Sequence, residues 1–179
     1  MKYYVRIFVP GYETIRQKTD EFLDKMQWRP KIGFHALPWK EYVEYCPEIL
    51  SAFEGLYGLK PVWAATYITY NDNHSRIHVD NKNPCTHSHE CRISLPIRNC
   101  AGTFTEFFTG GEYDEIYQPS GEKFYLLRQG STATKVDQVE MLGPTVMRVM
   151  EPHRVSHPHQ KQRVNLTVYT DKDPVFLLD

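Results

Sequence analysis

Side chains that bind metals are concentrated in one stretch of the sequence, RIHVDNKNPCTHSHECR, which runs from residue 76 to residue 92. This stretch holds three histidines, two cysteines, one aspartate and one glutamate. Imidazole, thiolate and carboxylate groups are the usual ligands of transition metals in proteins. The composition therefore indicates a metal site, and the spacing of the residues is the first evidence on which of them form it.

His78 and Asp80 are two residues apart, so on a β-strand their side chains share one face. Two histidines and one carboxylate on one side of an octahedral ferrous ion leave three adjacent positions open, as in non-haem iron oxygenases. The second histidine has to come from another part of the chain. The candidates are His153, His157 and His159, in the segment EPHRVSHPHQKQR.

The elements that position these residues are expected to be helices first and strands afterwards. Residues 2–9 predict a strand that ends at Pro10-Gly11, and residues 12–28 carry apolar side chains at helical spacing. Residues 38–57 also predict helix, which Pro47 divides or kinks and Gly58 ends.

From Pro61 onward the segments are short, strand-like and separated by turn residues: VWAATYITY, CRISLPIRN, GTFTEFF, KFYLLRQ, KVDQVEM, TVMRVM and RVNLTVYT. His153 is expected to end the strand that contains TVMRVM. This order predicts a mainly β jelly roll with N-terminal supporting helices packed on one sheet. We treat 1–179 as one domain, with the strand and helices in 1–60 and the jelly-roll core in 61–170.

The predicted strands alternate between apolar and polar faces. In QRVNLTVYT, Val164, Leu166 and Val168 alternate with Arg163, Asn165, Thr167 and Tyr169. In RISLPIRN, Ser94 shares the polar face with Arg92 and Arg98. Alternation fits both a solvated outer face and a polar inner face that lines a site, and the pattern alone leaves both readings open.

With these motifs the sequence resembles the Fe(II)/2-oxoglutarate-dependent dioxygenases, specifically their prolyl-hydroxylase-like branch of small microbial or phage type. The resemblance rests on HVD at 78–80, PHRV at 152–155 and QRVNLTV at 162–168, with support from RISLPIRNCAGTFTEFF, and it covers roughly residues 61–170. It implies a double-stranded β-helix, which is the jelly roll expected above.

The resemblance also implies roles for individual residues. His78, Asp80 and His153 would be the iron ligands, and Arg163 would bind the distal carboxylate of 2-oxoglutarate through a two-pronged hydrogen-bonded pair. The co-substrates would be 2-oxoglutarate and O2, the products succinate and CO2, and the usual reaction the hydroxylation of an unactivated C–H bond.

Two further residues are expected to touch the co-substrate. Tyr70 ends the strand before the H-x-D motif, where relatives in this branch often place a tyrosine against 2-oxoglutarate. Ser94 lies on the same strand face as Arg92. The alternatives are a tyrosine of the core and a serine of the surface.

Two other functions fit the same fold. The jelly roll can be a catalytically idle binding or structural module, because fold does not fix function. It can also be a cupin-like metal enzyme that does not use 2-oxoglutarate. An idle module has no physical need for the complete set of His78, Asp80, His153 and Arg163. Arg163 discriminates against the cupin-like enzyme, which needs no anchor for a dicarboxylate.

Cys85, His87, His89 and Cys91 alternate, which resembles a zinc site. On an extended chain adjacent members lie about 6–7 Å apart and the outer two about 20 Å apart. Ligands of one tetrahedral zinc lie about 2.0–2.3 Å from the ion, so the loop would have to fold back tightly. We interpret His87 and His89 instead as part of a flap near the substrate opening.

The overall composition excludes several classes of protein. The 179 residues are 41% hydrophobic and carry a formal net charge of −1, which argues against a strongly electrostatic nucleic-acid binder. No apolar run approaches the length of a membrane span, and no signal peptide is evident, so we expect a cytoplasmic protein. The substrate is expected to be a small molecule or a protein side chain, and the sequence does not identify it.

Overall fold

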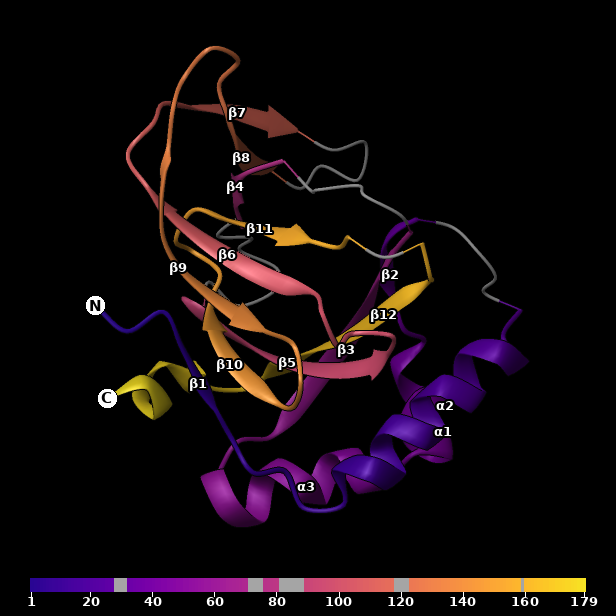
Figure 1. Cartoon of the computed structure of the whole chain (residues 1–179). Helices are drawn as coiled ribbons and strands as arrows, with labels where there is room; N and C mark the ends of the chain where they lie inside the picture. Colours follow the sequence, from indigo (N-terminus) through magenta and orange to yellow (C-terminus); the bar gives the residue numbers. More distant parts are fainter. Residues whose placement is uncertain (28–31, 71–75, 81–88, 118–122, 159) are drawn as a thin grey trace.

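The computed structural model of the chain describes all residues except 28–31, 71–75, 81–88, 118–122 and 159. Two antiparallel sheets of six strands each lie on one another, and the helices cover the outer face of one of them (Figure 1). We refer to the helix-covered sheet as the major sheet and to the other as the minor sheet. The predicted jelly roll with N-terminal supporting helices is thereby confirmed.

The strands interleave along the chain, so that each sheet combines distant segments. The major sheet has the order β1 (Tyr4–Arg6), β10 (Thr145–Arg148), β5 (Cys91–Arg98), β12 (Arg163–Thr170), β3 (Pro61–Thr69) and β2 (Gly33–Ala36). The minor sheet has the order β7 (Tyr113–Tyr117), β8 (Lys123–Leu127), β4 (His78–Val79), β11 (His153–Ser156), β6 (Phe104–Thr109) and β9 (Thr134–Glu140).

The helices lie where the sequence predicts them. They are α1 (Tyr12–Lys25), α2 (Trp39–Tyr45) and α3 (Glu48–Tyr57), and a short 3-10 helix, η1 (Pro174–Leu178), follows the last strand. Pro47 separates α2 from α3. Gly58 ends α3 in the left-handed conformation, with φ 61°, which glycine adopts without a Cβ clash.

The main hydrophobic core lies between the helices and the major sheet. The sheet contributes alternate residues of its central strands, and the helices contribute their buried faces: Ile93, Leu95, Ile97, Val164, Leu166 and Val168 from the sheet, with Ile15, Phe22, Ile49 and Phe53 from the helices. The other face of the same strands therefore turns toward the minor sheet. Arg92, Ser94, Arg163 and Asn165 lie on that inner face and are all buried.

The inner face of the major sheet is thus polar and buried at once, which decides between the two readings of the alternation. Each strand pair of the major sheet fixes which residues lie side by side there. Arg163 pairs with Thr69 and Asn165 with Tyr67 across β12 and β3, while Thr167 pairs with Ser94 across β12 and β5.

The structure also departs from the sequence prediction at several elements. The first strand covers only Tyr4–Arg6, and β2 and β7 were not predicted. TVMRVM and His153 do not form one strand: β10 ends at Arg148 in the major sheet, and His153 begins β11 in the minor sheet. Period-two patterning cannot show such a change of sheet, because both strands alternate in the same way.

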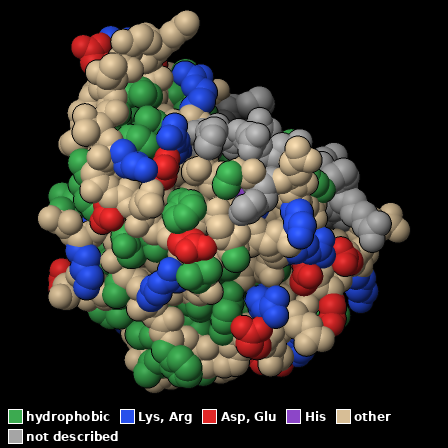
Figure 2. All heavy atoms as spheres, in the orientation of Figure 1, with side chains coloured by type: hydrophobic (Ala, Val, Ile, Leu, Met, Phe, Trp, Pro, Cys, Tyr) green, Lys and Arg blue, Asp and Glu red, His purple; other side chains and the backbone are tan. Residues whose placement is uncertain are grey.

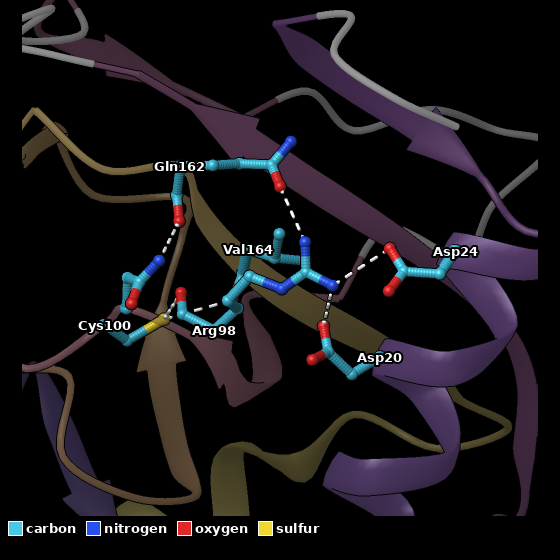
Figure 3. Close-up of polar contacts among 7 residues, drawn as sticks. Asp20, Asp24, Arg98, Cys100, Gln162 and Val164 are labelled. Carbon is cyan, nitrogen blue, oxygen red and sulfur yellow. Dashed lines mark hydrogen bonds and ion pairs between the residues drawn. The ribbon is translucent and has the colours of Figure 1, made fainter. Parts of the chain in front are cut away.

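A polar network fixes the chain on both sides of Arg163 (Figure 3). Arg98 at the end of β5 pairs with Asp20 and Asp24 of α1, at 2.7 and 3.1 Å, and donates to Gln162 Oε1 at 2.9 Å. The Cys100 thiol donates to the Val164 carbonyl at 3.0 Å. Residues 162 and 164 are therefore held from the same turn, so the backbone that carries Arg163 is fixed to α1 and β5.

Charged side chains of both signs are interspersed over the face shown in Figure 2, among the residues that are coloured by type. Within the described parts of the chain, the helices are too short or too polar to span a membrane.

Candidate metal and co-substrate site

β4 and β11 are neighbours in the minor sheet and bring three predicted metal ligands together. His153 pairs directly with His78, and Asp80 follows the end of β4. The Asp80 Oδ1 atom lies 3.5 Å from His78 Nε2 and 3.9 Å from His153 Nε2. One ligand atom from each of the three residues lies within 4.8 Å of the other two, so a single ion can contact all three.

Backbone carbonyls orient both imidazole rings. His78 Nδ1 lies 2.8 Å from the Arg76 carbonyl oxygen, and His153 Nδ1 lies 2.9 Å from the Glu151 carbonyl oxygen. A carbonyl only accepts hydrogen bonds, so each Nδ1 carries a proton and donates it. When neutral, each ring then presents the lone pair of Nε2 toward Asp80, which is the arrangement that metal-binding histidines commonly show.

Burial keeps His153 neutral. Desolvation is the main reason that the pKa of His153 is lowered to about 4; the neighbouring His78 contributes to this lowering, and Asp80 and the hydrogen bond with Glu151 oppose it. The two rings lie 4.4 Å apart between centroids. At neutral pH the Nε2 atom of His153 is therefore available to a metal without first losing a proton.

Arg163, at the start of β12, is a buried cation that lacks an acidic partner within the described chain. Its side chain is among the largest that are fully buried, with 2% of the residue exposed. Nε donates to the Thr103 hydroxyl at 3.1 Å, whereas Nη1 is buried without a hydrogen-bond partner. Burial lowers the pKa of Arg163, although a guanidinium stays charged in proteins.

The surroundings of Arg163 offer further polar groups. Thr69, its direct partner across β12 and β3, has a buried hydroxyl without a hydrogen-bond partner. Tyr67, two residues earlier on β3, lies within electrostatic reach of both Arg163 and Asp80. Burial raises the pKa of Tyr67 most strongly; Asp80 raises it further and Arg163 lowers it. Tyr67 thus lies within electrostatic reach of one predicted metal ligand and of the buried arginine.

The contact with 2-oxoglutarate that the sequence suggested stays a prediction for Tyr70, which follows the last residue of β3. Tyr70 packs against the helix-side core, whereas Tyr67 faces the inner side together with Thr69. The sequence selected the tyrosine nearest to the H-x-D motif, whereas the tyrosine on the same sheet face as Arg163 is Tyr67. The missed residues, Tyr67 and Thr69, share the strand parity that places Arg163 inside, but only the pairing of β3 with β12 reveals it.

Ser94 faces inward as expected and is buried. Its hydroxyl donates to Asn165 Oδ1 at 2.9 Å, so it belongs to a polar pair in the middle of the inner face. Of the other candidate histidines, His157 is buried with Nε2 2.7 Å from the Lys161 carbonyl oxygen, and His159 lies outside the described residues.

Most of the cysteine-histidine loop, including Cys85 and His87, also lies outside the described residues, so the flap interpretation stays a prediction. Cys91 is described: it is the first residue of β5, fully buried in the helix-side core, and burial raises its thiol pKa to about 12. That thiol is protonated at neutral pH and faces the helices, which does not suit a zinc ligand.

The chain was compared with known proteins. Neither a family model nor a curated protein matches it. Among solved structures, a prolyl-4-hydroxylase from Pseudomonas putida is 14% identical with a TM-score of 0.50, covering 95% of this chain and 92% of that one. AviO1 from Streptomyces viridochromogenes Tue57 is 13% identical with a TM-score of 0.51, covering 97% and 90% of the two chains. EvdMO1 is 12% identical with a TM-score of 0.52, covering 96% of this chain and 47% of its own. At such identities the likeness establishes the fold.

Proposed function

We propose that the chain is an Fe(II)- and 2-oxoglutarate-dependent dioxygenase that hydroxylates a C–H bond of its prime substrate. The balanced reaction converts R–H, O2 and 2-oxoglutarate into R–OH, succinate and CO2. One oxygen atom of O2 enters the alcohol and the other enters succinate. The two electrons that O2 requires beyond those of the C–H bond come from the oxidative decarboxylation of the keto acid.

The donor set of the three ligands fits ferrous iron. His78, Asp80 and His153 supply two neutral imidazole nitrogens and one carboxylate oxygen, the facial set that leaves three positions open on an octahedral ion. The carbonyls of Arg76 and Glu151 hold the rings in the tautomer that directs Nε2 to the ion. When bound, iron and 2-oxoglutarate together supply the oxygen activation that protein side chains lack.

The surroundings of Arg163 fit the distal carboxylate of 2-oxoglutarate. A guanidinium presents parallel N–H groups to the two oxygens of a carboxylate, and the unpartnered Nη1 of Arg163 is such a donor. The Thr69 hydroxyl, which also lacks a partner, is placed to donate to the same group. An anion there compensates a buried positive charge, which is costly to leave unpaired.

One observation carries the proposal: the described chain gathers three metal-binding side chains in one cluster and buries an arginine without an acidic partner, and Tyr67 lies within electrostatic reach of both Asp80 and that arginine. An idle jelly roll has no need to bury an unpaired cation. A metal enzyme that does not use 2-oxoglutarate has no need for this cation either.

The test is an anaerobic titration of the full chain with Fe(II) and 2-oxoglutarate, followed by the visible charge-transfer band of the joint complex. Arg163→Met should weaken 2-oxoglutarate binding by about thirtyfold or more, since a desolvated charge pair contributes about 2–5 kcal/mol. Iron binding alone should be unchanged in this variant. The matched control is Arg128→Met, because Arg128 is half-exposed and pairs with Glu112 and Asp114 on the surface.

The alternatives predict different results. An idle module binds neither iron nor 2-oxoglutarate, and a cupin-like enzyme binds the metal but gives no band with 2-oxoglutarate. Either result, or an Arg163→Met variant with undiminished 2-oxoglutarate affinity, contradicts the proposal.

A further inference from the structure

Arg92 is a second buried arginine on the inner face of the major sheet. Only 5% of the residue is exposed. Its Nη1 donates to the carbonyls of His89 and Cys91, at 2.7 and 3.0 Å, and its buried Nε has no hydrogen-bond partner in the part of the chain that the structure describes. Among the described residues no carboxylate forms an ion pair with it. The backbone carbonyls orient the guanidinium but do not neutralise its charge.

Backbone contacts place Arg92 near the metal-ligand cluster. The Asp80 amide donates to the Val149 carbonyl at 3.0 Å, and the Val149 amide donates to the Glu90 carbonyl at 2.9 Å. Arg92 follows two residues after Glu90 and pairs with Met147 across β5 and β10. Asp80 and Arg92 are therefore held by the same connection between β10 and β11.

Arg92 and Arg163 lie at opposite ends of β12 and cannot serve one small anion. Arg163 is the first residue of β12, and the Arg92 guanidinium lies 4.8 Å from the ring centre of Tyr169, near the last. Residues 163 and 169 are six positions apart, which corresponds to roughly 20 Å of strand. The two carboxylates of one 2-oxoglutarate are too close together to reach both arginines. The proposed function uses Arg163, which leaves the charge of Arg92 to another ligand.

An aromatic row leads from Arg92 to the edge of the major sheet. The rings of Tyr169 and Trp63 are tilted by 47° with 4.6 Å between their centres, and the Trp63 ring lies 5.9 Å from that of Phe34 on the edge strand β2. Phe34 is 46% exposed, whereas Arg92 is buried. The row thus runs from the surface to a buried cation and offers flat apolar contacts along its length.

We propose that Arg92 binds an oxyanion of the prime substrate, a carboxylate or a phosphate, and that Trp63 and Tyr169 pack against the apolar or aromatic body that carries it. The inference rests on the proposed function, because it takes Arg163 to be the anchor of 2-oxoglutarate. It narrows the substrate class to acids with an apolar or aromatic body. The guanidinium fits both oxyanions, so the experiment has to tell them apart.

The experiment is calorimetric titration of the full chain, loaded with Co(II) and 2-oxoglutarate, with three probes of similar shape. Phenylacetate and phenyl phosphate carry the oxyanion, and phenylacetamide is the neutral match of the first. The wild-type protein should bind at least one acid about tenfold or more tightly than the amide, and the tighter acid identifies the oxyanion. Arg92→Met should abolish this difference and leave 2-oxoglutarate affinity within about threefold.

Two further variants separate charge from packing. Trp63→Ala should weaken phenylacetate and phenylacetamide to the same degree, because it removes contacts with the body and leaves the charge. If Arg92→Met does not fold, Arg92→Gln replaces it, because the glutamine amide can still donate a hydrogen bond to a backbone carbonyl. Circular dichroism checks the fold of each variant.

The inference and the proposed function fail in different ways. Absence of 2-oxoglutarate binding in the wild-type protein contradicts the proposed function, whatever the probes do. Equal affinity for acids and amide, no binding of either acid, or an acid preference that persists in Arg92→Met overturns the role of Arg92. Loss of 2-oxoglutarate binding in Arg92→Met but not in Arg163→Met overturns it as well, by making Arg92 the co-substrate anchor.

Discussion

Asp80 offers the sharpest test of the metal site, because it is the only carboxylate of the ligand cluster and its side chain is 37% exposed. Replacing a half-exposed side chain usually changes the free energy of unfolding by no more than about 0.5 kcal/mol. We therefore expect the metal-free Asp80→Ala variant to melt close to the wild-type protein. The difference should appear only when a metal is added.

The magnitude follows from binding linkage. A metal present at about 100 times its dissociation constant stabilises the folded state by about 2.7 kcal/mol. For a chain of this size each kcal/mol shifts the melting temperature by about 2–4 °C, so the wild-type protein should gain about 5–11 °C. Asp80→Ala leaves two imidazoles from adjacent strands and loses the one anionic ligand, so most of this gain should disappear.

The assay is thermal unfolding followed by circular dichroism, with and without Co(II), which accepts the same nitrogen and oxygen donors as ferrous iron. The control is Glu54→Ala, which removes an exposed carboxylate from α3, on the far side of the major sheet. It should retain the full metal-dependent shift. An equal shift in Asp80→Ala, or no shift in the wild-type protein, would refute the assignment of the ligand cluster.

Three further perturbations follow from the packing and the polar networks. Arg98→Met should loosen the chain beside Arg163 and weaken 2-oxoglutarate binding several-fold in a calorimetric titration, while Co(II) binding stays unchanged. An equal loss of 2-oxoglutarate and Co(II) binding would contradict the role of Arg98 in fixing the chain beside Arg163. Desolvation raises the pKa of Glu106, but hydrogen bonds from Arg154 and Lys135 outweigh it and lower this pKa below the ordinary value of 4.5. The ionised Glu106 carboxylate therefore stabilises the fold fully above pH 4.5, and this stabilisation is lost as the pH falls through the lowered pKa. Glu106→Gln should therefore cost about 1 kcal/mol near neutral pH, and urea unfolding should show the difference shrinking in acid; a difference independent of pH would rule this out. Phe53→Ala, in the helix-side core, should cost about 3–5 kcal/mol in urea unfolding without changing metal affinity, and a much smaller loss would mean that the helices contribute little to the core.

The sequence alone predicted a large part of the site. The H-x-D spacing placed His78 and Asp80 together, because side chains two residues apart on an extended chain point the same way. The alternation of β12 separated Arg163 and Asn165 from Val164, Leu166 and Val168, and the structure confirms that separation. The direction of a side chain depends on the local backbone, and the backbone of a strand repeats every two residues.

The helices were predictable for a similar reason. Pro47 interrupts and Gly58 ends the helical segments through restrictions on their own backbone dihedral angles, and these restrictions act within a few residues. The boundary at Pro61 was also visible, since helical spacing stops there and the first long strand begins at the same residue.

Only the tertiary structure decided which faces meet. His78 and His153 become neighbours because β4 and β11 pair in the minor sheet, while β10, which precedes β11, pairs in the major sheet. The same assembly brings Tyr67 within electrostatic reach of Arg163, packs Tyr70 against the helix-side core and buries Arg92 beside Tyr169. The two-residue repeat of a strand predicts which side chains share a face. Whether that face is buried, and which residues it contacts, depends on strands distant in sequence, whose register is set by packing the whole core.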